Sequence, residues 1–152
     1  MPEIVHRIGI RAPVPQVLQA LATTQGVAGW WTRHTSGTTG PGGVMTTAFH
    51  NPQGEEIGRF VIETLPSENA TDVRWRVKEG PAEWVNTDIS FALSSQDGQT
   101  IVHFAHRHWP DAEEFMAHCS MKWATFLLSL RALVEEGKGR PAPDDLKIDN
   151  WN

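Results

Sequence analysis

Two histidines in the second half of the chain are the side chains best placed for acid–base chemistry. His106 and His108 alternate with Val102 and Phe104, so on a strand all four would point to the same apolar face. An imidazole buried there without a charged partner has its pKa lowered and stays neutral, able to donate one hydrogen bond and accept another. The pair could contact a ligand or act as a general acid and base. Alternatively, each ring is held by hydrogen bonds to the backbone or by packing against Trp109, or His108 lies at the solvent-exposed end of the strand.

The same spacing has a metal-binding interpretation. Two imidazoles on one face of a strand, completed by His50 or His118, would make a three-ligand site. No carboxylate or third histidine stands at a spacing typical of zinc sites. We therefore expect no metal and no cofactor.

Other reactive residue types give weaker signals. Cys119 falls on the apolar stripe of a predicted helix, where a thiol usually serves as a small apolar filler. Glu63 is a candidate base if its face of the strand points inward, but both faces of that strand are about equally apolar, and the choice stays open. His6 fits a satisfied core histidine and His103 a solvent-facing one. Because no serine has the Gly-x-Ser-x-Gly setting of a hydrolase nucleophile, the residues favour a non-catalytic binding protein over an enzyme.

Hydrophobic periodicity predicts the elements that would position these residues. Period-2 alternation indicates a strand over residues 3–11 and further strands, separated by turns, over 44–50, 57–65, 73–77, 85–93 and 100–109. Two short helices are expected at 14–22 and from Thr23 or Thr24 to Trp31, with a glycine-rich loop at 36–43. After Pro110 the period becomes helical, with Asp111 as the expected cap and Gly137 as the end.

This order of elements predicts an α+β fold. Six to seven curved antiparallel strands need a cover on their apolar face, and the long C-terminal helix supplies one. We expect one domain over residues 1–137 and a loose tail over 138–152, with a cavity between sheet and helix as the ligand site. The predicted walls are the two histidines together with six aromatic residues, Phe49, Trp75, Phe91, Phe104, Trp123 and Phe126.

Composition excludes several classes of partner. The net charge is −5 and no Lys/Arg block is present, which argues against binding to nucleic acids or anionic membranes. No apolar run is long enough to span a bilayer, and the first residues lack the order of a signal peptide. With Cys119 as the single cysteine, these features predict a cytoplasmic protein.

Three segments resemble the START-like helix-grip (SRPBCC) superfamily. Residues 8–21 are similar to its opening strand and helix. Residues 26–32, with Trp30 and Trp31, resemble the tryptophan pair of the branch formed by homologues of the heat-shock-protein-90 ATPase activator. Residues 102–109 resemble that branch's last strand, except that His108 stands where the family often has a small residue. The resemblance, over about residues 4–137, implies the helix-grip fold.

The function expected from these features is binding of a small apolar or aromatic molecule between the sheet and the long helix. One alternative is a cyclase- or hydrolase-like enzyme that uses His106 or His108. Another is a chaperone-type interaction module, with an exposed apolar patch around Trp30, Trp31 or Trp84. The tail is too short to supply a second client-binding domain, which argues against a chaperone partner. Homodimerisation stays open.

Overall fold

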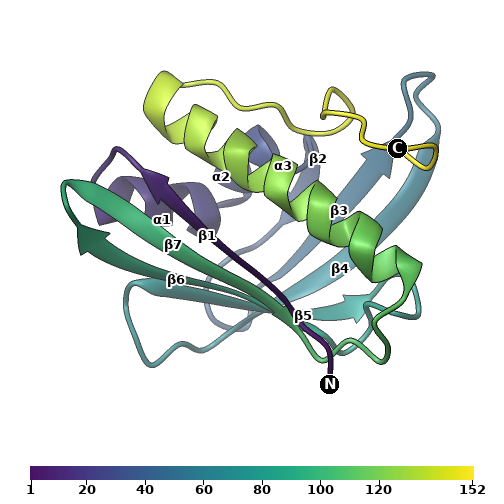
Figure 1. Cartoon of the computed structure of the whole chain (residues 1–152), viewed down its shortest axis with the longest axis horizontal. Coiled ribbons are helices and arrows are strands. Elements are labelled where there is room, and N and C mark those ends of the chain that lie inside the picture. Colours follow the sequence, from purple (N-terminus) through teal and green to yellow (C-terminus); the bar gives the residue numbers. More distant parts are fainter.

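A single curved antiparallel sheet holds one long helix against its concave face (Figure 1). The computed structural model describes all of residues 1–152. The seven strands are β1 (Ile4–Ile10), β2 (His34–Gly37), β3 (Val44–His50), β4 (Glu56–Leu65), β5 (Asp72–Glu79), β6 (Asp88–Gln96) and β7 (Gln99–Arg107). They are ordered β1-β7-β6-β5-β4-β3-β2 in the sheet. The predicted α+β helix-grip class is confirmed.

Three helices complete the domain. Helices α1 (Val14–Ala22) and α2 (Thr24–Trp30) form a corner between β1 and β2, and α3 (Glu114–Glu136) crosses the sheet beside β1. Helix α3 begins three residues after the predicted cap, Asp111, and its N-cap residue Glu113 makes no side-chain hydrogen bond. Its end is as predicted: Gly137 takes the left-handed conformation (φ 82°), and its N–H bonds the carbonyl of Leu133.

Three strand predictions need correction. Part of the glycine-rich segment forms β2, paired with β3, because His34 to Gly37 find ladder partners that local sequence does not reveal. Val85 and Thr87, predicted to begin a strand, lie in a turn closed by the hydrogen bond from the Thr87 N–H to the Trp84 carbonyl. Strand β7 ends at Arg107, because His108 adopts a positive φ of 75° that breaks the extended backbone.

Aromatic residues fill the space between sheet and helix. Trp31, at the end of α2, stacks on Trp75 of β5 and Trp123 of α3, with ring centroids 5.6 and 5.2 Å apart respectively. Phe91 and Phe104 are directly opposite each other on β6 and β7 and pack edge to face at 5.4 Å. All five rings are almost fully buried. Such large side chains contribute strongly to the stability of a core.

The corner between α1 and α2 depends on a close approach at Gly26. A Cβ atom added there would lie 2.6 Å from the backbone of Ala20. The same corner is tied by the hydrogen bond from Trp30 Nε1 to the Ala20 carbonyl, at 2.9 Å. The corner therefore sets the position of Trp30 and of its neighbour Trp31.

We expect Gly26→Ala to lower the free energy of unfolding by about 2 kcal/mol, although alanine is the better helix former. Urea denaturation measures the change. Gly58→Ala is the matched control, because an added Cβ there meets nothing within 4 Å. Equal stability of the two variants would contradict the close approach.

Candidate functional site

A pocket of about 390 Å³ remains at one end of the interior, between β3, β4 and the first half of α3. Most of its lining is apolar and aromatic. The lining residues are Trp31, Phe49, Ile57, Gly58, Phe60, Pro81, Trp84, Phe115, His118, Cys119, Lys122, Trp123, Phe126, Trp151 and Asn152. We call this space the aromatic pocket. Its size falls within the usual range for small-molecule sites, about 300–1,000 Å³.

The walls of the aromatic pocket are held by ring stacking. Phe60 of β4 lies parallel to Trp84, with centroids 4.3 Å apart and an interplanar angle of 1°. Phe49 packs edge to face on Phe60 at 5.3 Å and on Phe126 at 6.4 Å. Because each ring is supported by another, the walls are formed before any ligand enters.

The sequence predicts a loose tail over residues 138–152, but this segment runs back along α3 (Figure 1). Its last two residues, Trp151 and Asn152, close one side of the aromatic pocket. Lys122 of α3 pairs with the carboxylate of Asp145 and donates to the carbonyl of Leu146, at 2.8 Å. Closer to the start of the helix, His118 Nδ1 lies 2.7 Å from Asp149. This hydrogen bond lowers the pKa of the Asp149 carboxyl.

Further contacts attach the same segment to the body of the protein. Ala142 is buried and forms a parallel bridge with Thr32, just after α2. The ring of Trp151 packs on His118 with centroids 5.2 Å apart. The aromatic pocket is thus walled by residues from distant parts of the sequence, from Trp31 at the end of α2 to Asn152 in the C-terminal segment.

The structure separates the predicted wall residues into two groups. Phe49, Trp123 and Phe126 line the aromatic pocket. Trp75, Phe91 and Phe104 lie deeper, packed against other rings of the core.

Neither predicted histidine lines the aromatic pocket. His106 is fully buried within a chain of hydrogen bonds. Trp123 Nε1 donates to His106 Nδ1 (3.1 Å), so Nε2 carries the proton and donates to Thr87 Oγ1 (2.8 Å). The hydroxyl of Thr87 in turn donates to the carbonyl of Trp84. Both ring nitrogens are occupied, and burial lowers the pKa of His106 from 6.5 to about 3. A neutral, fully bonded imidazole here positions Trp123 and Trp84.

His108 lies outside the sheet, beyond the end of β7. Its Nε2 is 3.7 Å from the carboxylate of Asp88, and its side chain is more than half exposed. The cyclase- or hydrolase-like alternative required one of these two histidines in the pocket. The pocket walls contain neither.

Other candidate residues are also placed by the structure. Glu63 lies across from Arg76 in the β4–β5 register and 3.8 Å from Lys78, at the edge of salt-bridge distance. His6 Nε2 bonds the carbonyl of Ser120 (3.1 Å), which makes it a satisfied histidine between β1 and α3. His103 is exposed, as predicted.

Cys119 lines the aromatic pocket, but it is not poised as a nucleophile. Burial raises the pKa of its thiol to about 12. The nearby N–H of Trp84 acts in the opposite direction, although the contact lacks the geometry of a hydrogen bond. The thiol is therefore protonated at neutral pH, and it acts as a weak donor.

Several pocket residues were not among the predicted walls. Phe60 shares its parity on β4 with the buried Ile62, and this alternation was the one available signal. The sequence places Trp31 in a tryptophan pair and, with Trp84, in the alternative exposed patch, and neither position predicts a pocket wall. Trp151 and Asn152 reach the pocket by the return of the C-terminal segment, which no local pattern indicates.

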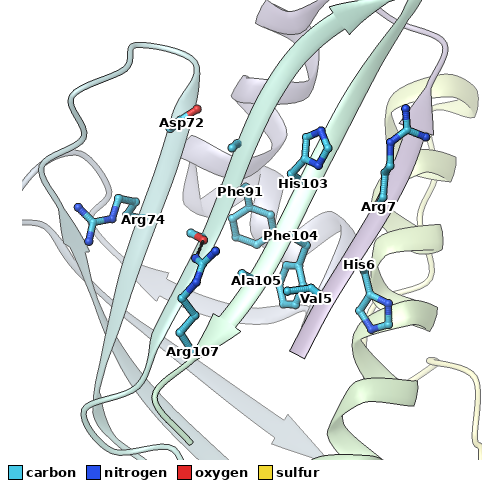
Figure 2. A pocket seen from close by; sticks show the side chains of 12 residues that line it. Val5, His6, Arg7, Asp72, Arg74, Phe91, His103, Phe104, Ala105 and Arg107 are labelled. Atoms are coloured by element: carbon cyan, nitrogen blue, oxygen red, sulfur yellow. Dashed lines mark hydrogen bonds between the residues drawn. The ribbon is translucent and has the colours of Figure 1, made fainter. Parts of the chain in front are cut away.

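A second hollow lies on the outer face of the sheet (Figure 2). The small residues Ser90, Ala92 and Ala105 are part of its lining, and so are several basic side chains. These are Arg7, Arg74, His103 and Arg107. Arg107 is engaged by Glu3 at 3.2 Å and by Ser90 at 3.0 Å. The lining of this hollow is less apolar than that of the aromatic pocket.

Sequence comparison assigns the family. The profile described as Activator of Hsp90 ATPase homolog 1-like protein matches residues 11–135. The chain belongs to this family. The resemblance found in the sequence is thereby confirmed. No curated protein matches the sequence.

Solved structures agree with the Activator of Hsp90 ATPase homolog 1-like assignment. The Aha1 dimer from Colwellia psychrerythraea is 38% identical, with a TM-score of 0.78 over 91% of this chain and 100% of that one. DynU16, from the dynemicin biosynthetic locus, is 20% identical, with a TM-score of 0.73 over 90% of this chain and 48% of that one. MLL2253 from Mesorhizobium loti is 17% identical, with a TM-score of 0.73 over 89% of this chain and 98% of that one. The last two support the fold alone.

Two features are absent from the structure of this family member. None of its helices has the length and apolar character required to traverse a bilayer. No group of three or more His, Cys, Asp or Glu side chains is arranged to hold a metal ion. Trp30, Trp31 and Trp84 are buried, so none of them forms the exposed apolar patch that an interaction module would use.

Proposed function

We propose that this protein binds a small, flat apolar or aromatic molecule in the aromatic pocket. The observation that carries the proposal is a space of about 390 Å³ lined mainly by stacked aromatic rings, with an open side. Rings such as Phe60 and Trp84 already support one another, so a flat ligand can enter with little rearrangement of the walls. The family membership supplies the helix-grip scaffold, in which this pocket lies between sheet and helix.

Gly58 offers a direct way to test this proposal. It lies on β4 in the pocket lining, and a Cβ added there would meet nothing within 4 Å. A large side chain at this position therefore enters the space proposed for the ligand without colliding with the backbone. Its φ angle is not positive, so a substitution introduces no backbone strain of that kind.

The neutral dye N-phenyl-1-naphthylamine, which fluoresces in apolar surroundings, is the probe. We expect it to bind the wild-type protein and to bind Gly58→Phe at least about tenfold more weakly, a loss of about 1.4 kcal/mol. Gly58→Ala is the matched control and should retain the affinity. At about 100 times its dissociation constant, the dye should also stabilise the wild type by about 2.7 kcal/mol. Equal binding to wild type and Gly58→Phe, or no binding to either, would reject the aromatic pocket as the site.

A further inference from the structure

The polar atoms at the aromatic pocket are mainly hydrogen-bond donors. No Asp or Glu side chain is among the lining residues, whereas Lys122 and His118 are. The carboxylates that hold these two residues, Asp145 and Asp149, belong to the C-terminal segment and do not line the pocket. The main-chain oxygen of Asn152 is engaged by the N–H of Ile148, at 2.9 Å. The side chains at the pocket therefore offer a ligand more donors than acceptors.

One donor in the wall makes no hydrogen bond of good geometry. Trp84 is 4% exposed, and its indole Nε1 makes no hydrogen bond. A buried N–H without a good partner is costly, because its hydration is lost and not replaced. Two other buried side-chain atoms lack partners, His50 Nδ1 and Trp109 Nε1, but neither residue lines the aromatic pocket. The neighbour of Trp84 at this point is the protonated thiol of Cys119, whose sulfur is only a weak acceptor.

Charge at the pocket also favours an anion. Lys122 and Lys147 both pair with the single carboxylate of Asp145, which leaves one positive charge in excess in this cluster. The ammonium of Lys122 lies 5.2 Å from the ring centroid of Phe126, which forms part of the wall. A ligand stacked on Phe126 is thus within reach of the excess charge.

We propose that the ligand is an aromatic monoanion, such as an aryl carboxylate, whose oxygen accepts the Trp84 indole N–H while its charge lies near Lys122. This inference rests on the proposed function, since it specifies the ligand of the same pocket. The ring system provides the apolar contact with the stacked walls. The oxygen satisfies the free donor.

Two probes of similar shape distinguish the contribution of the ligand's charge to affinity from that of its ring system. These are 2-naphthoate and the neutral ketone 2-acetonaphthone, with affinities measured by isothermal titration calorimetry. We expect naphthoate to bind at least about tenfold more tightly. In Lys147→Met the excess charge is gone while Lys122 keeps its partner, so the preference for naphthoate should shrink severalfold. Lys147 does not line the pocket, and affinity for the ketone should not change.

Two measurements test the role of Trp84. Trp84→Phe keeps a ring and removes the N–H, and it should weaken naphthoate binding about tenfold or more, a loss typical of a hydrogen bond to a charged acceptor. In the wild type, the Trp84 indole N–H resonance should move downfield when naphthoate is added, which does not depend on the variant folding. A ketone that binds as tightly as naphthoate, with an unmoved indole resonance, would overturn this inference and leave the proposed function intact. If naphthoate, the ketone and the naphthylamine dye all fail to bind, both are rejected.

Discussion

Replacing Asp145 by asparagine is expected to lower the free energy of unfolding by about 3 kcal/mol at neutral pH. The side chains of Lys122 and Asp145 are only 10% and 2% exposed, so the substitution leaves an ammonium in a largely dry site without its counter-ion. Uncompensated buried charge is among the most destabilising changes a single substitution makes. Urea denaturation followed by tryptophan fluorescence measures the loss.

Two further variants distinguish the buried pair from ordinary surface charge. Lys147 is 41% exposed and also pairs with Asp145, at 2.9 Å, yet Lys147→Met should cost no more than about 1 kcal/mol. The double variant Lys122→Met/Asp145→Asn should be more stable than Asp145→Asn alone, because it leaves no unpaired ammonium buried at position 122. A double variant no more stable than the single one would show that the ion pair does not hold the C-terminal segment to α3.

The sign of the pH effect at Asp145 follows from its surroundings. Burial alone raises the pKa of this carboxyl, but hydrogen bonds from Lys122 and Lys147 outweigh burial and lower it below 3.8. A carboxyl with a lowered folded-state pKa contributes stability above its ordinary pKa and loses it as the pH falls through the lowered value. The difference between wild type and Asp145→Asn should therefore persist from neutral pH down to about pH 4 and shrink only below it.

Acidification from about pH 6.5 to about pH 4.5 is expected to cost about 2 kcal/mol through His106 alone. The folded-state pKa is about 3, because burial disfavours the imidazolium, and the ordinary value is 6.5. Between these values the unfolded chain takes up a proton that the folded protein does not bind. Stability therefore falls with decreasing pH, by up to about 1.4 kcal/mol per pH unit.

The measurement is the unfolding free energy of wild type and His106→Gln across this pH range. Glutamine retains one donor and one acceptor for Thr87 and Trp123 but does not titrate. The variant should be less stable at neutral pH and should show a shallower dependence on pH. His103→Gln is the matched control, because His103 projects from the same strand into solvent and its replacement leaves the buried imidazole of His106 in place. Equal slopes for wild type and His106→Gln would contradict the buried neutral imidazole.

Local periodicity was sufficient to predict most of this fold. Alternation on the strands identified Trp75, Phe91 and Phe104 as inward residues, and the helical stripe after Pro110 identified Cys119, Trp123 and Phe126. These predictions succeed because side-chain direction is set by backbone geometry alone, with a period of 2 on strands and 3.6 on helices. Where backbone conformation departed from the regular element, as at His108 with its positive φ, strand parity did not set the direction of the side chain.

Only the tertiary structure decided which inward residues form a solid core and which surround open space. Phe49 and Phe104 have the same kind of sequence signal, yet one lines the aromatic pocket and the other is enclosed by Phe91, Trp123 and His6. Likewise, Trp84 and Trp151 join the pocket because a turn and the returning C-terminal segment place them there. The space between side chains depends on how distant segments pack. Asp145 lies 23 residues from Lys122 along the chain, and the two side chains are in contact only because the segment after Gly137 folds back on α3. The amino-acid pattern therefore determined the sheet, the helix and their apolar faces, while packing between remote segments determined the pocket and its donors.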